Sequence, residues 1–337
     1  MKYRPEIDGL RAIAVVPVIL FHAGVELFDG GFVGVDVFFV ISGYLITSII
    51  LREIDDGKFS LTHFYERRAR RILPALFFVI LVTTIFGFLI LSPSQLENYS
   101  DSALATSTYW SNIYFWRNIN YFGGSAELAP LLHTWSLSIE EQYYVIYPFF
   151  LLIFWRLGKR NILAILTVAF VISLATSQWA TSSYPHASFY LLLTRGWEIL
   201  AGAFIAFYLQ NRRRERDANA ARQLASIAGL GLITYSVFAF GPGTPFPGAY
   251  TLVPTIGTAL IVLFAVNGTF VNTLLKTRAL VAIGLISYGA YLWHQPILAF
   301  SRHLNIATSN LGFAFSAASL ILVLSFMSYR YVETPFR

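Results

Sequence analysis

LPALFFVILVTTIFGFLIL (residues 73–91) is a run of apolar side chains without a charge, and this kind of stretch decides the fold class of the chain. At about 1.5 Å of rise per helical residue, such a run spans the roughly 30 Å hydrocarbon layer of a bilayer. None of the apolar runs shows the alternation of a barrel strand, so the sequence predicts an all-α, polytopic membrane protein. Eleven candidate runs occur, at residues 11–28, 32–51, 73–91, 101–116, 138–155, 161–178, 190–209, 223–240, 250–267, 279–300 and 311–329.

The composition agrees with a surface that faces lipid. Of the 337 residues, 56% are hydrophobic and 12% are charged, whereas soluble domains carry about 25% charged residues. The sequence has no cysteine, which excludes disulfides, thiolate nucleophiles and zinc sites built on sulfur. The histidines lack metal-ligand spacing and no phosphate-binding glycine loop occurs, so we expect no bound metal and no ATP-driven transport.

The basic residues predict the topology, because Lys and Arg gather in cytoplasmic loops. The run 101–116 is rich in Ser, Thr and Asn, so we expect a re-entrant or interfacial segment there and ten transmembrane helices with both termini in the cytoplasm. We expect no cleavable signal peptide, since the first run is long and begins at Arg11. In this arrangement 21 of the 24 Lys and Arg residues lie in the cytoplasm, and the other three are Arg117, Arg195 and Arg302.

Ionisable side chains inside apolar runs point to an interior site. Such residues cost about 3 kcal/mol or more in a bilayer unless they face a cavity or a partner. Arg11 and His22 are three helical turns apart, so they share one helix face at a separation of about 16 Å. Asp36 lies in the next run among small residues such as Ser42. It forms an interhelical ion pair, for instance with Arg195, or it takes part in the chemistry.

A cluster of four arginines at residues 67–71 precedes the third run. Arg68 and Arg71 are three residues apart and share a helix face. Guanidinium forks match phosphate geometry, so the cluster binds either a phosphorylated cytosolic ligand or anionic lipid headgroups.

The remaining embedded polar residues lie in three later runs. Glu140 and Tyr144 are one helical turn apart, and Arg195 and Glu198 are close enough in sequence to pair on one face. These residues either shape an acceptor site or hold the helices together, and the whole set is Asp36, Ser42, Trp135, Ser136, Glu140, Tyr144, Arg195, Trp197, Glu198 and His294.

An ordered series of motifs resembles the acyltransferase-3 family of bacterial integral-membrane O-acyltransferases, which includes glycan and O-antigen O-acetylases. The resemblance covers essentially the whole chain. It rests on residues 4–9 with Arg11 and His22, and on residues 31–44, 67–74, 133–144, 194–202, 287–296 and 329–336.

The resemblance implies a domain in the bacterial inner membrane that moves an acetyl group from cytoplasmic acetyl-CoA to a hydroxyl of an outer glycan, such as O-antigen, lipopolysaccharide or peptidoglycan. Acetyl-CoA is the donor substrate, and no resident cofactor is implied. Arg11, Arg68 and Arg71 would bind CoA. His22, assisted by Arg11, would be catalytic, either as a general base or as a transient acyl carrier.

Many members of this family continue into an extracytoplasmic hydrolase-like domain after their closing Glu-x-Pro-Phe motif. This chain stops at Arg337, directly after that motif. We therefore expect residues 1–337 to form a single membrane domain, either a stand-alone form that relies on a separate hydrolase-like partner or a truncated one.

A secondary transporter or exporter of a small solute is the main alternative, because embedded acids, arginines and histidines also form proton relays. A non-catalytic membrane scaffold for glycan assembly is a third hypothesis. Only the acyltransferase would cleave acetyl-CoA, and it would lose activity without His22. We expect no nucleic-acid partner, since the basic residues are accounted for by topology.

Overall fold

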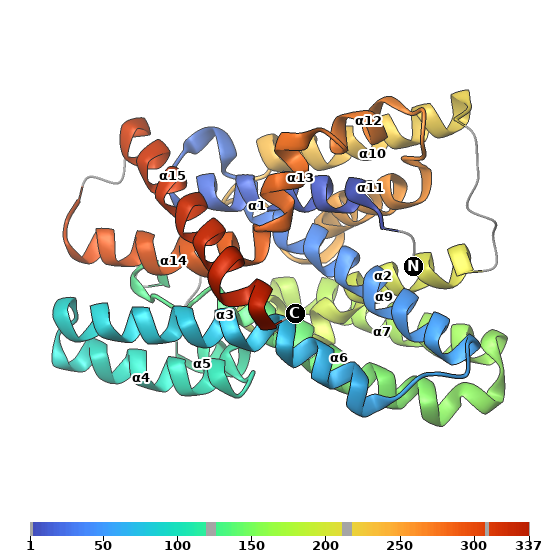
Figure 1. Cartoon of the computed structure of the whole chain (residues 1–337), viewed down its shortest axis with the longest axis horizontal. Coiled ribbons are helices and arrows are strands. Elements are labelled where there is room, and N and C mark those ends of the chain that lie inside the picture. The colour runs from blue at the N-terminus through green and yellow to red at the C-terminus, as the bar shows by residue number, and fades with distance from the viewer. Residues whose placement is uncertain (1–2, 119–125, 211–217, 307–309, 337) are drawn as a thin grey trace.

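The computed structural model describes residues 3–118, 126–210, 218–306 and 310–336, and these residues form helices and no strand, as the sequence predicts. Figure 1 shows their arrangement. The helices are α1 (Pro5–His22), α2 (Gly34–Asp55), α3 (Leu61–Ile90), α4 (Pro93–Ser107), α5 (Ser111–Asn118), α6 (Thr134–Phe154), α7 (Lys159–Ser183), α8 (Pro185–Tyr190), α9 (Leu192–Gln210), α10 (Ala220–Ala239), α11 (Leu252–Phe264), α12 (Phe270–Leu275), α13 (Arg278–Leu285), α14 (Ser287–His303) and α15 (Leu311–Ser328).

Five helical segments of the described chain are long and apolar enough to cross a bilayer, so the protein is a multi-pass membrane protein. Within their most apolar windows, the segments of α7 and α15 bury only 22% and 28% of their residues, whereas that of α2 buries 72%. Thus α7 and α15 present apolar side chains outward, as lipid-facing helices do, and α2 lies inside the bundle. The five segments are Gly31–Asp55, Leu61–Ile90, Lys159–Ser183, Pro185–Gln210 and Leu311–Phe336.

The first helix lies earlier in the sequence than expected. It covers Pro5–His22 rather than residues 11–28. Proline is well suited to the first turn, because its fixed φ matches the helix and its missing N–H is not needed there. Gly24 follows with a φ of 78°, a conformation that ends helices. His22 is therefore the last residue of α1.

Two other apolar runs are interrupted. Residues 101–116 do not form one helix, because the chain turns between α4 and α5 at Tyr109, whose φ is 57°. They form no continuous span, which agrees with the expected re-entrant or interfacial segment. The position of this segment in the bilayer remains a prediction. The run 279–300 forms α13 and α14, with a break at Ile286.

Glycines let α2 and α9 approach one another until their backbones touch. A Cβ atom on Gly43 would lie 1.8 Å from the carbonyl oxygen of Ile199. One on Gly202 would lie 2.0 Å from the carbonyl oxygen of Val40. Only a residue without a side chain fits at these positions, and the close approach of the two helices fixes everything that they carry.

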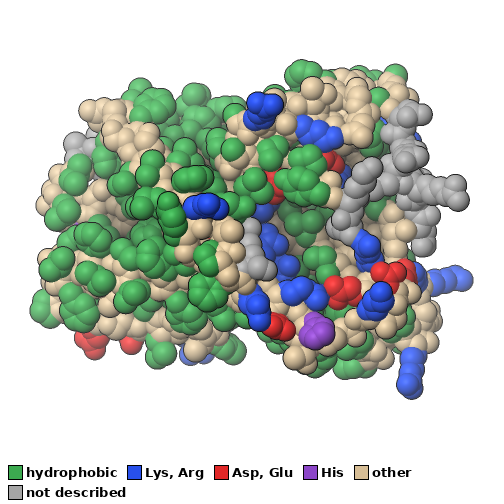
Figure 2. All heavy atoms as spheres, in the orientation of Figure 1, with side chains coloured by type: hydrophobic (Ala, Val, Ile, Leu, Met, Phe, Trp, Pro, Cys, Tyr) green, Lys and Arg blue, Asp and Glu red, His purple; other side chains and the backbone are tan. Residues whose placement is uncertain are grey.

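The ends of several helices gather at one end of the molecule, which we call the basic end. Lys159 of α7 and Gln210 of α9 both donate to the carboxylate of Asp55 at the end of α2, at 3.3 and 2.5 Å. Arg67 of α3 pairs with Glu53 at 2.7 Å. Most Lys and Arg side chains visible in Figure 2 lie on the right half of the view, where the basic end is, and the left half is mainly hydrophobic. Residues 212–216, Lys2 and Arg337 lie outside the described residues.

Replacing Gly43 with alanine should destabilise the protein by about 1–3 kcal/mol, because the new methyl group forces α2 and α9 apart. Thermal unfolding in detergent measures the effect. The matched control is Gly231→Ala on α10, where a Cβ would meet no atom within 4 Å. Equal unfolding temperatures for the two variants would contradict the role of the glycine contact.

Candidate active site

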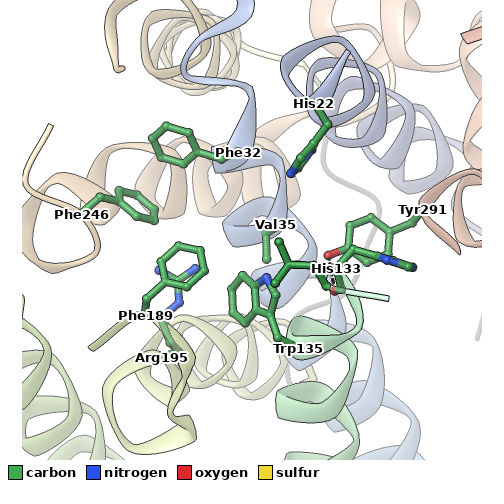
Figure 3. A pocket seen from close by; sticks show the side chains of 10 residues that line it. His22, Phe32, Val35, His133, Trp135, Phe189, Arg195, Phe246 and Tyr291 are labelled. Carbon is green, nitrogen blue, oxygen red and sulfur yellow. Dashed lines mark hydrogen bonds between the residues drawn. The ribbon is translucent and has the colours of Figure 1, made fainter. Parts of the chain in front are cut away.

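Two cavities lie between the helices. The larger one, the arginine cavity, has a volume of about 860 Å³ when the space open to solvent is included, and it is lined from α1, α2, α3, α6 and α14. The smaller one, the histidine cavity, has room for about one water-sized group and lies around His22, His133 and Arg195 (Figure 3). Val35 and Tyr291 line both cavities, so the two cavities lie next to one another in the bundle.

Three guanidinium groups line the arginine cavity. Arg68 and Arg71 come from the first turns of α3, which begins at the basic end, and Arg11 comes from α1. Arg11 lies 3.5 Å from the carboxylate of Asp8. Within the described chain, Arg68 and Arg71 form no ion pair, whereas their neighbour Arg70 pairs with Glu66 at 2.7 Å. Charge without a carboxylate partner, inside a cavity, suits an anionic ligand.

Glu140 of α6 lines the arginine cavity and is held by hydrogen bonds from α2 and from its own helix. The hydroxyl of Ser42 on α2 donates to its Oε1 at 2.9 Å, and the hydroxyl of Tyr144 donates to its Oε2 at 3.3 Å. All three side chains line the cavity. These two hydrogen bonds orient a partly buried carboxylate that has no ion-pair partner among the described residues.

His22 enters the histidine cavity from the end of α1. Its Nδ1 lies 2.9 Å from the carbonyl oxygen of Val18. Because a carbonyl only accepts hydrogen bonds, Nδ1 carries the proton and Nε2 keeps its lone pair. The carbonyl oxygen of His22 accepts a hydrogen bond from Arg302 at 2.5 Å, which ties the end of α1 to α14. In the neutral ring, the Nδ1 contact leaves the Nε2 lone pair of His22 free to accept a proton.

Two further imidazoles lie beside His22. The ring of His294 is 5.1 Å from that of His22 and 5.1 Å from that of His133, measured between centroids. His294 donates from Nδ1 to the carbonyl oxygen of Tyr291 at 2.5 Å. Both ring nitrogens of His133 are buried and have no hydrogen-bond partner in the described part of the protein. The cluster thus contains buried ring nitrogens available for a ligand or for a proton.

Arg195 lies at the bottom of the histidine cavity, 1% exposed, between two fully buried carboxylates. It lies 2.5 Å from Asp36 of α2 and 3.3 Å from Glu198, one turn along α9. Four aromatic rings lie 5.2–5.7 Å from the guanidinium carbon, within the range of a cation–π interaction, namely Phe39, Trp135, Phe189 and Phe246.

The structure brings most of the expected site residues to these two cavities. Those in the arginine cavity are Arg11, Ser42, Arg68, Arg71, Ser136, Glu140 and Tyr144, and those at the histidine cavity are His22, Trp135, Arg195 and His294. Asp36 and Glu198 line neither of the two described cavities and instead hold Arg195 in place. Trp197 also lines neither cavity, because its ring packs against Phe170 of α7 at 5.8 Å. Of the two hypotheses for Asp36, the structure shows the interhelical ion pair with Arg195.

Sequence reasoning missed three residues that touch this site. His133 directly precedes α6, and we expected it only as part of the motif at residues 133–144. Its position just before Thr134-Trp135-Ser136 could have marked it as a site residue. Tyr291 lies one turn before His294, and its hydroxyl is 2.6 Å from Ser136 Oγ. Arg302 gave no signal, because its contact with the backbone of His22 joins residues far apart in the sequence.

Comparison with known proteins agrees with these features. Residues 4–330 match a family model described as an acyltransferase domain, Acyl_transf_3. Peptidoglycan O-acetyltransferase OatA of Listeria monocytogenes is 34% identical over all of this chain and 56% of its own length. O-acetyltransferase OatA of Staphylococcus aureus is 32% identical over all of this chain and 57% of its own length. The chain thus spans a little over half the length of these relatives. No solved structure matches it.

Replacing Arg195 with methionine should destabilise the protein by about 3–5 kcal/mol, because it leaves two carboxylates buried without a counter-charge. Adding Asp36→Asn to this variant should recover part of the loss. The control is Arg70→Met, which breaks a pair whose side chains are 61% and 49% exposed and should change stability by less than about 1 kcal/mol. Thermal unfolding in detergent tests both, and a similar loss for both would contradict the prediction.

Proposed function

The chain belongs to the Acyl_transf_3 family of acyltransferase domains, and from this premise we propose that it is a membrane-embedded O-acetyltransferase. Its donor is acetyl-CoA and its acceptor is a hydroxyl of a cell-envelope glycan. The observation that carries the proposal is that the arginine cavity lies next to the cavity of His22, with Val35 and Tyr291 lining both. The names of the relatives, which specify O-acetyltransferases, support the same reaction.

The arginine cavity is the donor site of this proposal. CoA carries phosphates at one end and the thioester at the other. Arg68 and Arg71 bind the phosphates near the basic end, and Arg11 supports the arm on its way inward. On α1, Arg11 and His22 are about 16 Å apart, so a thin arm can reach His22 while the charged part of CoA stays at the basic end.

His22 is the general base of the transfer. Its Nε2 takes the proton from the acceptor hydroxyl while the oxygen attacks the carbonyl carbon of the thioester. The tetrahedral intermediate collapses, the carbon–sulfur bond breaks, and the imidazolium returns the proton to the leaving thiolate. The products are the O-acetyl ester and CoA. A covalent acyl-histidine is the alternative, and a protein-bound, hydroxylamine-sensitive label would indicate it.

The helices α1, α2, α3, α6, α7, α9, α10, α11, α14 and α15 make the ten crossings of the proposed topology. The basic end then faces the cytoplasm, with both chain termini on that side, and the membrane is the bacterial inner membrane. The gathering of Asp55, Lys159 and Gln210 at that end supports this orientation, as does the distribution of Lys and Arg in Figure 2.

The acceptor reaches His22 from the outer side of the membrane. Among outer glycans we favour peptidoglycan, because the name of the Listeria relative specifies it. The relatives are longer than this chain, which fits a separate or additional extracytoplasmic hydrolase-like domain. A transporter would carry an intact solute, whereas this site cleaves its donor.

His22→Ala should reduce CoA release from acetyl-CoA by at least about a hundredfold, because the base is lost, while the protein still folds. The measurement uses proteoliposomes with the basic end outward, acetyl-CoA outside and soluble peptidoglycan fragments inside. Released CoA is read with a thiol reagent, and the chain has no cysteine to interfere. The control is His63→Ala, at an exposed position on α3. Full activity of His22→Ala would overturn the assignment.

Arg68→Gln and Arg71→Gln should each raise the KM for acetyl-CoA by about tenfold or more, since each removes a charge-assisted phosphate contact of about 1.5–3 kcal/mol. The matched control is Arg70→Gln, in the same five-residue segment but paired with Glu66 outside the cavity. Initial rates against acetyl-CoA concentration give the comparison. If all three variants behave alike, the segment acts through its overall charge and the donor site lies elsewhere.

A further inference from the structure

Two side chains separate the arginine cavity from the histidine cavity. Val35 of α2 and Tyr291 of α14 line both cavities. In the view of Figure 3, Val35 lies between His22 and Trp135. An acyl group that travels from the CoA arm to His22 passes these two residues. We propose that Val35 limits the length of the acyl group that the protein transfers, an inference that rests on the function proposed above.

Along the face of α2 that lines the arginine cavity, Val35 is the residue at the end next to the histidine cavity. Ile46, Ser42, Phe38 and Val35 all line the arginine cavity, and their spacing of three or four residues places them on one side of the helix. They extend over about 16 Å at the rise of an α-helix. Of these four, only Val35 also lines the histidine cavity. It therefore stands where the donor path reaches the reacting imidazole.

Tyr291, the other side of the passage, is held in place. Its hydroxyl donates to the carbonyl oxygen of His133 at 2.9 Å and lies 2.6 Å from Ser136 Oγ. Its ring centroid is 5.1 Å from that of His294 and 5.4 Å from that of His133. Moving this ring would break both polar contacts. The width of the passage is thus set by Val35, whose β-branched side chain has a restricted χ1 angle.

The histidine cavity is small on the far side of Val35. Its free space holds about one water-sized group. A methyl group is of similar size, so the acyl end of acetyl fits there. A longer chain would meet the methyl groups of Val35 or the apolar walls formed by Phe32, Leu132 and Phe246. This geometry favours acetyl over butyryl.

A purely structural role for Val35 makes a different prediction, and Val37 provides the matched control. Val37 lies on the same helix, is fully buried, and belongs to a core cluster with Leu10 and Val40. It is not among the residues that line either of the two described cavities. Val35→Ala and Val37→Ala remove the same two methyl groups, so packing loss alone would affect both in the same way.

The experiment measures kcat/KM for butyryl-CoA and for acetyl-CoA, by CoA release, in lipid nanodiscs with soluble peptidoglycan fragments as acceptor. The ratio of the two values is compared among the wild type, Val35→Ala, Val35→Ile and Val37→Ala. We expect Val35→Ala to raise the butyryl-to-acetyl ratio by about tenfold or more, the effect of a changed methylene fit in an apolar pocket. Val35→Ile should lower it, and Val37→Ala should leave it within about twofold.

The outcomes separate the inference from the function on which it rests. If the wild type releases no CoA from acetyl-CoA, the proposed function fails and the inference fails with it. If the wild type is active and Val35→Ala has the ratio of Val37→Ala, only the inference is overturned. An unchanged ratio in Val35→Ile would also count against it.

A second measurement does not depend on turnover. The chain has no cysteine, so Val35→Cys introduces a single thiol at the passage and Val37→Cys a single thiol in the packed core. We expect acetyl-CoA to slow alkylation of the thiol at Val35 by N-ethylmaleimide by about tenfold, the protection expected at a concentration about ten times Kd, without an effect at Val37. Equal rates at Val35 with and without acetyl-CoA would place the donor arm elsewhere.

Discussion

The ion pair between Arg195 and Asp36 is the interaction on which the rest of the site depends. It joins α9 to α2 in the interior of the bundle, where neither side chain is more than 1% exposed. Removing one partner of such a buried pair costs about 3–5 kcal/mol, so the two helices are held in one register. The glycine contacts at Gly43 and Gly202 act on the same pair of helices. The buried ion pair and the glycine contacts therefore constrain the same two helices, α2 and α9.

The same ion pair shapes the histidine cavity. The rings of Trp135, Phe189 and Phe246 come from α6, α8 and the segment before α11, and all three surround the guanidinium of Arg195. Those rings also form the walls of the cavity that His22 enters. A cation with aromatic neighbours thus organises an apolar chamber around an imidazole.

Two antiparallel helices give the site its direction. α1 carries Arg11 near one end and His22 at the other, and α2 runs beside it from Val35 to Ile46 along the arginine cavity. In the proposed reaction, the charge that binds a phosphorylated donor is therefore at the basic end, and the base is at the opposite end of the same path. This separation is what a reaction across a membrane requires, since the charged part of the donor has no need to enter the apolar layer.

The sequence by itself determined the helical, multi-pass class of this protein, because apolar runs of bilayer length allow no other backbone solution. It also placed Arg11 and His22 on one helix face and Arg68 and Arg71 on another, since spacing along one helix is a local property, and all four residues line the two cavities. The bounds of α1 were wrong by six residues, because Pro5 and Gly24 outweigh the hydropathy on which the range was based. The proline and the glycine each act on the backbone within about one helical turn.

Only the tertiary structure decided which distant segments meet. His133, Tyr291 and Arg302 reach the site through contacts between α1, the start of α6 and α14. Trp197 turns away toward α7, although its neighbours in sequence hold the ion pair. Val35 of α2 and Tyr291 of α14 line the same two cavities only because the packing brings these helices together. Helix periodicity fixes the face on which a side chain lies, whereas the helix that the face meets depends on the packing of the whole bundle.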